Sequence, residues 1–277
     1  MPKPIVLAVD EDATDDGPSL AWAASEAALR GAELRLLHAC GDAAPDYARQ
    51  FLDTLADGLR KRSPELLAVN VEAVPGDVRD ALAAATASAE LLVLGARGSG
   101  GFPGLLVGST SLHLAGTAGC PVVVVPDRRG IGAGSVDGRV VVGVDAKDPD
   151  EAVLDFAFEA AERRSRSLRA VHAWRYPLLT QGRAMPPVYE KGHIEADEER
   201  LLAEVLAGWR QRYPSVDVGE ASVRSGAAKE LVALSADAAL VVVGRHGSHA
   251  GPLSRLGSVS LAVVQNALCP VAVVPVG

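Results

Sequence analysis

The strongest constraint on the fold of this chain is an internal duplication. Four short apolar runs occur in the same order in both halves. The pairs are IVLAVD (5–10) and VVVGVD (140–145), LRLLHA (34–39) and LRAVHA (168–173), LLVLGARG (91–98) and LVVVGRHG (240–247), and CPVVVVP (120–126) and CPVAVVP (269–275). Because a repeated pattern marks a repeated folding unit, the duplication predicts two similar domains in tandem.

The length and the middle of the chain fit this division. With 277 residues the chain exceeds the usual size of a single hydrophobic core. The stretch DRRGIGAGSVDG, residues 127–138, has the glycine content of a flexible connector. We therefore predict a first domain over 1–127, a linker over 128–138 and a second domain over 139–277.

The apolar runs predict strands that are covered on both faces, because each is a nearly continuous series of Val, Leu and Ile. Alanine-rich segments with helical spacing lie between them, such as 19–31 and 77–89, where Asp77 is placed to cap a helix. Strands that alternate with helices form parallel sheets. The sequence therefore predicts an α/β fold of two tandem open parallel five-stranded sheets with helices on both faces.

The second half has a longer connection after its second strand. Residues 175–193 are rich in Pro and Gly, which indicates a loop over the second site. The segment 197–212 places Leu, Val and Trp on one helical stripe, with acids first and arginines last, as the helix dipole prefers. This segment predicts a helix that faces the core.

Composition argues against several classes of protein. The formal charge of −8 and a pI near 5.3 disfavour a nucleic-acid partner, which would need clustered Lys and Arg. No apolar run approaches the roughly 18 to 20 residues of a membrane span, and none forms a signal-peptide core. We expect a soluble, cytoplasmic protein without a membrane partner. Three cysteines without metal-ligand spacing fit reduced, buried thiols.

A glycine pattern, G-x-x-G-x9-G-S, occurs once in each half after an apolar run. It comprises Gly95, Gly98, Gly108 and Ser109 in the first half, and Gly244, Gly247, Gly257 and Ser258 in the second. Ligands of parallel sheets bind where such loops leave the carboxyl ends of strands. Glycines permit positive φ or close approach of a ligand, and free amides at the next helix start attract anions. The serine hydroxyls, with those of Ser111 and Ser260, add donors for phosphate oxygens. Each loop therefore predicts a phosphate cradle.

These loops, the Asp that ends each first strand and the His-Ala that ends each second strand resemble the universal stress protein family. The resemblance covers nearly the whole chain, as a tandem form of the ATP-binding branch, in which the glycine loop and its serine hold the phosphates and ribose. It implies that Asp10 and Asp145 lie on the nucleoside side, and that the backbone of Ala39 and Ala173 hydrogen-bonds adenine. It further implies one ATP, with Mg²⁺, in each half of a Rossmann-like, adenine nucleotide alpha hydrolase-like fold.

The same resemblance implies that the halves pair through their last strands. The runs PVVVVP and PVAVVP would then lie antiparallel within one molecule and form an internal pseudo-dimer. Such pairing would cover two apolar edges that otherwise stay open. A further homodimer and the regulatory protein partners are left open by the sequence.

We predict a nucleotide-dependent stress-response regulator or sensor rather than an enzyme, with no catalytic residues and no protein ligands for a metal. The alternative is a slow ATPase or nucleotidyl-transfer enzyme on the same fold, but neither glycine loop holds the lysine of a P-loop. A dinucleotide-binding dehydrogenase is a weaker alternative, because acids rather than glycines follow the first strands. A duplicate that binds no ligand would not explain the repeated glycines.

The interiors of the two glycine loops differ. His246, His249 and Arg255 occur in the second loop, and we do not favour these histidines as metal ligands or general bases. Because the second loop holds more cationic and hydrogen-bonding groups, we expect the second site to bind phosphate at least as tightly as the first.

Overall fold

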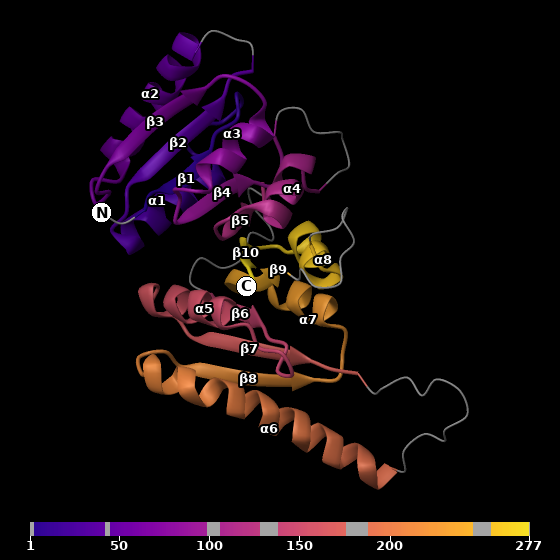
Figure 1. Ribbon diagram of the computed structural model, residues 1–277. Helices are drawn as coiled ribbons and strands as arrows, with labels where there is room; N and C mark the ends of the chain where they lie inside the picture. The colour runs from indigo at the N-terminus through magenta and orange to yellow at the C-terminus, as the bar shows by residue number, and fades with distance from the viewer. Residues whose placement is uncertain are drawn as a thin grey trace.

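The computed structural model describes residues 3–41, 45–98, 106–127, 138–175, 188–245 and 256–276. Strands and helices alternate throughout both halves (Figure 1). The elements of the first half are β1 (Ile5–Ala8), α1 (Pro18–Arg30), β2 (Leu34–Ala39), α2 (Pro45–Arg62), β3 (Val69–Val74), α3 (Val78–Ala85), β4 (Leu91–Gly95), α4 (Ser109–Thr117) and β5 (Val122–Val125). Those of the second half are β6 (Arg139–Gly143), α5 (Glu151–Arg163), β7 (Leu168–Ala173), α6 (Val188–Arg212), β8 (Val218–Val223), α7 (Ala227–Leu234), β9 (Ala238–Arg245), α8 (Ser258–Asn266) and β10 (Val271–Pro275).

The strands of both halves form one ten-stranded sheet, which runs through the molecule in Figure 1. Within each half five strands lie parallel, in the orders β3-β2-β1-β4-β5 and β8-β7-β6-β9-β10. The halves meet where β5 and β10 pair antiparallel, with Val123 opposite Ala272. This pairing confirms the expected internal pseudo-dimer, and it leaves β3 and β8 as the outer edges.

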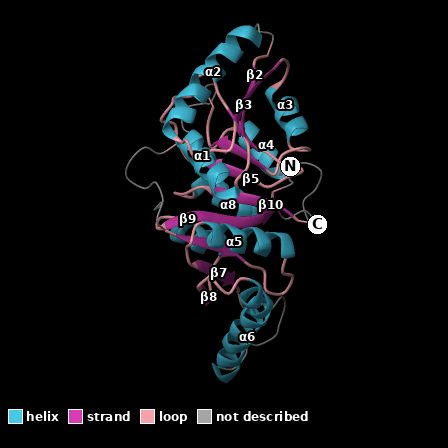
Figure 2. Ribbon diagram, turned by 90° about the vertical axis from the view of Figure 1, so that its left-hand side faces the viewer, coloured by secondary structure: helices cyan, strands magenta, loops and turns pink. Residues whose placement is uncertain are grey.

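Each strand contributes side chains to two apolar cores, one on each face of the sheet. In β1, Ile5 and Leu7 belong to one core and Val6 to the other. The first core takes the buried faces of α1, α2, α5 and α6, and the second takes those of α3, α4, α7 and α8. Figure 2 shows α1 and α2 on one side of the upper strands and α3 on the other. Helices on both faces are what the continuous apolar strands predict.

A local signal explains the start of α3 but not that of α6. The Asp77 carboxylate accepts a hydrogen bond from the Arg79 amide at 2.8 Å and caps α3, as predicted. The prediction of a loop over 175–193 is wrong at its end, because α6 already begins at Val188, while 176–187 lies outside the described residues. The first described side chains of α6 are mostly exposed, so no apolar period marked this start.

Two expectations from the composition concern membrane spans and cysteines. Within the described ranges, no helix is both long and apolar enough to cross a membrane. All three cysteines are free and buried, as expected. Burial raises the pKa of the Cys120 thiol to about 11 and that of Cys269 to about 12, which keeps both protonated at neutral pH.

The strand order reverses beside the first strand of each half. The chain runs from β1 through β2 to β3 and then returns to β4 on the other side of β1, and β6 and β9 repeat this relation. Ligands of open α/β sheets bind at such a point, beyond the carboxyl ends of the strands. Asp10 and Asp145 follow β1 and β6, while Gly95 and Gly244 lie near the ends of β4 and β9. The fold thus places predicted site residues at the reversal point of each half.

Candidate functional site

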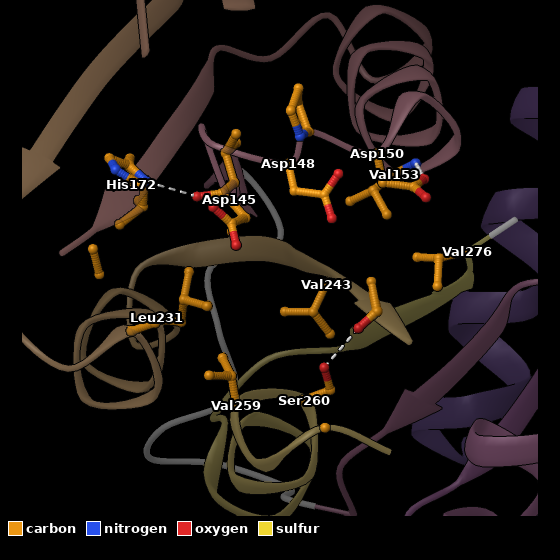
Figure 3. A pocket seen from close by; sticks show the side chains of 18 of the residues that line it. Asp145, Asp148, Asp150, Val153, His172, Leu231, Val243, Val259, Ser260 and Val276 are labelled. Atoms are coloured by element: carbon orange, nitrogen blue, oxygen red, sulfur yellow. Dashed lines mark hydrogen bonds between the residues drawn. The ribbon is translucent and has the colours of Figure 1, made fainter. Parts of the chain in front are cut away.

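The second half has a cavity of about 710 Å³ at the carboxyl ends of β6 and β9 (Figure 3). Residues of β7, α5, α7 and α8 complete its walls. The predicted residues that line it are Asp145, Ala173, Gly244, Gly257, Ser258 and Ser260. Gly247, the remaining predicted residue of this half, lies outside the described residues. The described predicted residues of the second half therefore share one cavity.

The first half has an equivalent cavity of about 430 Å³. All the residues predicted for this half line it: Asp10, Ala39, Gly95, Gly98, Gly108, Ser109 and Ser111. A second hollow of about 930 Å³ lies beside it, and Asp10 and Arg97 line both. The Arg97 guanidinium pairs with Asp127 at 3.3 Å. The first half thus brings its predicted residues together in a crevice that has two compartments.

The glycines of the loops allow close packing and access rather than unusual backbone angles. The φ angles of Gly108 and Gly257 are −72° and −63°, within the range of any residue. At Gly98, a Cβ would lie 2.4 Å from Asp10 Oδ2, so any other residue would require that carboxylate to move. A positive φ, which the glycine pattern permits, is therefore not the reason for glycine at 98, 108 and 257.

Glycine at 108 is not required by the packing of the protein itself. A Cβ there would meet no atom closer than the Ala96 carbonyl oxygen at 3.6 Å, an ordinary contact. Gly108 and Gly257 are the N-caps of α4 and α8, and neither has a side chain that could accept a hydrogen bond from the first-turn amides. Those amides carry the positive end of the helix dipole and have no acceptor within the helix. Each helix therefore presents an open start to its cavity, where an anion can bind.

The two buried serines of these helices have a different partner from the one expected. Ser111 Oγ donates to the Gly95 carbonyl oxygen at 2.9 Å, and Ser260 Oγ donates to that of Gly244 at 2.6 Å. Since a serine hydroxyl has one proton, these donors already serve the end of the neighbouring strand. Ser111 and Ser260 thus fix α4 and α8 to β4 and β9, and the exposed Ser109 and Ser258 are the hydroxyls that face solvent.

Both histidines at the ends of the second strands are buried and line their cavities. His38 Nδ1 lies 2.8 Å from the Val9 carbonyl oxygen, and His172 Nδ1 lies 3.1 Å from that of Val144. His172 has a further partner, since its Nε2 lies 2.9 Å from Glu198 of α6. The histidines thus hold the first-strand loops in place, as near-site residues with structural partners.

Glu198 connects the second cavity to α6. One carboxylate oxygen bonds His172 and the other lies 2.6 Å from Lys147 Nζ, in the loop after Asp145. Burial raises the pKa of Glu198, but the hydrogen bonds from Lys147 and His172 outweigh burial and lower it below its usual value. The carboxylate is therefore ionised at neutral pH. Sequence reasoning missed Glu198 and Lys147, because no spacing signal relates a helix residue to a loop so far away in the chain.

The second cavity has an acidic side. Asp148 and Asp150 line it together with Asp145, and Figure 3 shows their carboxylates around one region of the cavity. Asp150 also caps α5 by accepting a hydrogen bond from the Val153 amide at 3.0 Å. Carboxylates repel phosphate, so the start of α8 is the side of the cavity suited to an anion. Within the described ranges, no three His, Cys, Asp or Glu residues are grouped so that they could hold a metal ion.

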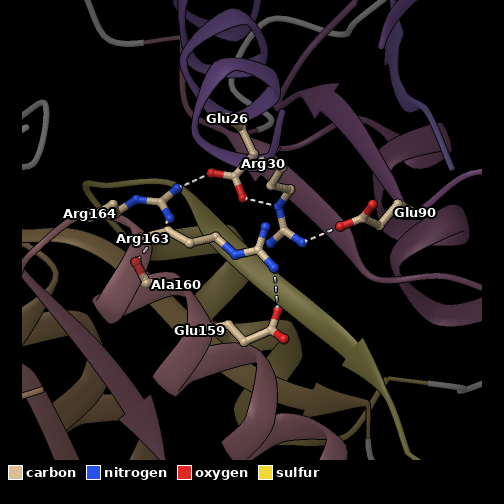
Figure 4. Close-up of polar contacts among 7 residues, drawn as sticks. All are labelled: Glu26, Arg30, Glu90, Glu159, Ala160, Arg163 and Arg164. Carbon is tan, nitrogen blue, oxygen red and sulfur yellow. Dashed lines mark hydrogen bonds and ion pairs between the residues drawn. The ribbon is translucent and has the colours of Figure 1, made fainter. Parts of the chain in front are cut away.

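Outside the cavities, a buried ion-pair cluster joins the two halves (Figure 4). Glu26 of α1 accepts hydrogen bonds from Arg30 Nε at 2.5 Å and from Arg164, which follows α5. Arg30 also pairs with Glu90 at 2.7 Å. Burial raises the pKa of Glu26, but attraction to Arg164 and Arg30 outweighs burial and lowers it. The Glu26 side chain is 1% exposed, so this charge depends entirely on its arginine partners.

Comparisons with known proteins agree with this architecture. A profile of the universal stress protein family matches residues 1–126 and 138–275. A universal stress protein of Mycobacterium tuberculosis is 34% identical over an alignment of 286 positions, which covers 94% of this chain and 93% of the relative. One from Mycolicibacterium smegmatis is 34% identical over an alignment of 291 positions, which covers 98% of this chain and 96% of the relative.

Solved structures of similar fold also span the whole chain. A putative universal stress protein from Pseudomonas aeruginosa has a TM-score of 0.66 at 18% identity and covers 99% of this chain and 94% of its own. One from Archaeoglobus fulgidus has a TM-score of 0.63 at 17% identity, with coverages of 99% and 97%. At these identities the likeness concerns the fold.

Proposed function

This chain belongs to the universal stress protein family, and from that premise we propose that each half binds ATP in its glycine-loop cavity. We propose further that nucleotide occupancy makes the protein a regulator or sensor in a cytoplasmic stress response. The observation that carries the proposal is that the described predicted residues of each half line one cavity beside an uncapped helix start.

The residues in each cavity suit the parts of an adenine nucleotide. The open starts of α4 and α8, with Ser109 and Ser258, would hold phosphate oxygens through backbone amides and hydroxyls. The Asp10 and Asp145 carboxylates would accept hydrogen bonds from ribose hydroxyls. The backbone of Ala39 and Ala173 would hydrogen-bond adenine. Mg²⁺ would be held mainly by the phosphates of the nucleotide, as is common for this ion.

The cavities are of a suitable size for this ligand, because small-molecule sites usually enclose about 300 to 1,000 Å³. The acidic side of the second cavity would face ribose, whose hydroxyls donate to carboxylates, rather than phosphate. We propose that binding, not turnover, is the main activity. Measurement of inorganic phosphate released from bound ATP distinguishes this from slow hydrolysis.

The test compares nucleotide binding by the wild type and by a chain with Gly108→Asp and Gly257→Asp. Both glycines have ordinary φ angles, and aspartate is a favourable N-cap, so we expect the variant to fold and to be at least as stable as the wild type. Its carboxylates would take the first-turn amides that phosphate needs. We expect one to two ATP per wild-type chain, by analysis of gently purified protein and by calorimetric titration, and none for the variant.

A matched control is Gly208→Asp in α6, where a Cβ meets no atom within 4 Å. It adds the same charge away from both cavities, so ATP binding should stay at the wild-type level. The proposal fails if wild-type protein binds no ATP at millimolar concentration with Mg²⁺, or if the well-folded double variant binds as well as the wild type.

A further inference from the structure

Arg79, in the first turn of α3, reaches the start of α4 in the first cavity. Its Nη2 donates to Ser109 Oγ at 2.9 Å, and Ser109 is the first residue of α4. Arg79 is exposed, and among the residues that the structure describes no carboxylate lies within ion-pair distance of its guanidinium. Within the described part of the chain, an arginine that pairs with no carboxylate therefore lies beside the proposed phosphate cradle.

This position is unfavourable for a cation unless an anion is present. The start of a helix is the positive end of its dipole, and Arg79 adds a full positive charge there. Asp77 caps α3 through the amides of Arg79 and Asp80, so its charge offsets the dipole of α3. The start of α4 has no such offset, because its N-cap is Gly108. Positive groups from two helices thus meet at one side of the cavity, and a phosphate group would satisfy both.

Among the described residues, the second half has no arginine at the position equivalent to Arg79. Leu82 and Leu231 are each 1% exposed and line their own cavities from α3 and α7, so they mark equivalent positions. Three residues before them stand Arg79 and Ala228. Neither residue is among those that line the cavities, but Arg79 reaches the first cavity through its hydrogen bond to Ser109, which does line it. Arg175 is a cation near α7, and its guanidinium lies against Gly226, the N-cap of α7.

We propose that Arg79 determines nucleotide specificity in the first cavity, by selecting ligands with more than one phosphate. This inference rests on the proposed function, nucleotide binding in that cavity. Arg79 and Ser109 are exposed whereas Ser111 is buried, so the guanidinium is placed for phosphates that extend toward solvent. ATP and ADP have such phosphates and AMP does not. The expectation that the second site binds phosphate at least as tightly concerns absolute affinity and rests on residues 246–255, which lie outside the described residues. Arg79 would instead set the ratio of ATP to AMP affinity in the first cavity.

The experiment measures each cavity alone in the full chain. Gly257→Asp blocks the second cavity, and in this background we expect Arg79→Gln to weaken ATP binding about tenfold and AMP binding less than about threefold, by calorimetric titration. Arg49→Gln is the matched control, because Arg49 is exposed on α2 and lines none of the cavities in the described part of the chain. It should change neither affinity. Thermal unfolding of each variant checks that it is folded.

The reciprocal change tests the same position in the second half. With the first cavity blocked by Gly108→Asp, Ala228→Arg should raise the ratio of ATP to AMP affinity. An unchanged ratio there would contradict the proposal, as would an equal loss of ATP and AMP affinity, or no loss, on Arg79→Gln. If the Gly257→Asp chain itself binds no ATP, the proposed function fails for the first cavity and this inference fails with it. If that chain binds ATP and Arg79→Gln changes nothing, this inference alone fails.

Discussion

Counted back from the first residues of β2 and β7, Arg30 and Arg164 occupy equivalent positions in the two halves. Each guanidinium lies over an aromatic ring of the other half, Arg30 at 5.3 Å from the centre of Phe156 and Arg164 at 5.7 Å from that of Trp22. Trp22 and Phe156 are themselves equivalent. The duplicated chain thus contacts itself almost as two copies related by a twofold axis would.

This symmetry ends at the carboxylate between the arginines. Glu26 binds both, and its equivalent in the second half is Ala160. The cavities differ in the same way, since Arg79 corresponds to Ala228, and His172 has Glu198 as a partner in α6. The comparison shows that the apolar strands and the glycine loops repeat, while individual charged side chains such as Glu26 and Arg79 do not. Equivalent positions therefore need not have equivalent functions.

The largest effect is expected where the halves share one buried charge. Glu26→Ala leaves Arg30 and Arg164 buried without that carboxylate, and removing one partner of a buried pair costs about 3 to 5 kcal/mol. We expect the free energy of unfolding, measured by urea denaturation, to fall by this amount.

Two further variants test how the burial and the position of the carboxylate set this loss. Glu90→Ala removes the other partner of Arg30. Because the Glu90 side chain is 30% exposed, this loss should lower the free energy of unfolding by only about 1 kcal/mol. If Glu26→Ala and Glu90→Ala lower the free energy of unfolding equally, burial of the carboxylate does not determine the size of the loss. Ala160→Glu in the Glu26→Ala chain moves the carboxylate to the equivalent position of the second half. Partial recovery of stability would show that a carboxylate at either position can pair with the two arginines.

A smaller effect is expected at the serines that fix the cradle helices. Ser111→Ala and Ser260→Ala each remove a hydrogen bond to a glycine carbonyl, at a cost of about 1 to 2 kcal/mol. Because the two bonds are equivalent, we expect equal losses in thermal unfolding, and each variant should weaken nucleotide binding in its own half. Loss of binding with unchanged stability would instead favour a direct contact between these hydroxyls and phosphate.

The smallest effect is expected for the contact found in the second half, between Glu198 and the cavity. Glu198→Gln replaces the charged partner of His172 and Lys147, and because Lys147 is 63% exposed we expect a loss of about 1 kcal/mol at neutral pH. The folded-state pKa of Glu198 is lowered, so its stabilisation is present above the ordinary glutamate pKa, about 4.3, and is lost as the pH falls through the lower folded value.

The pH dependence supplies the control for this variant. The difference in melting temperature between the wild type and Glu198→Gln should be largest at neutral pH and shrink as the pH falls below about 4. A difference that does not change with pH would mean that Glu198 acts by packing rather than by charge.

Much of the fold could be read from the sequence, because apolar runs and glycines act locally. The strands, the cap at Asp77 and the core-facing part of α6 follow from periodicity and composition. The beginning of α6 did not, because its first described side chains are mostly exposed and leave no apolar period. The antiparallel pairing of β5 and β10 came from a family resemblance, since nothing in a valine run specifies its partner.

The candidate site could be predicted less completely. The glycine pattern identified the loops, but the contact between Arg79 and Ser109 joins two helices, and exposed charged residues follow no period. The partners of Ser111 and Ser260 depend on how closely α4 and α8 approach the strands, which spacing alone does not determine. Such contacts between elements distant in sequence are set by tertiary structure.

The antiparallel pairing of β5 and β10 within one chain has a consequence for how the protein responds to dilution. Two separate copies of one half would hold such a contact only above their dissociation constant, so their assembly would vary with their abundance. Here β5 ends at Val125 and β6 begins at Arg139, so a short connection holds the halves together. A connection of this length corresponds to an effective concentration in the millimolar range. The paired state, and any response that depends on it, therefore stays the same whether a cell contains few copies of the protein or many.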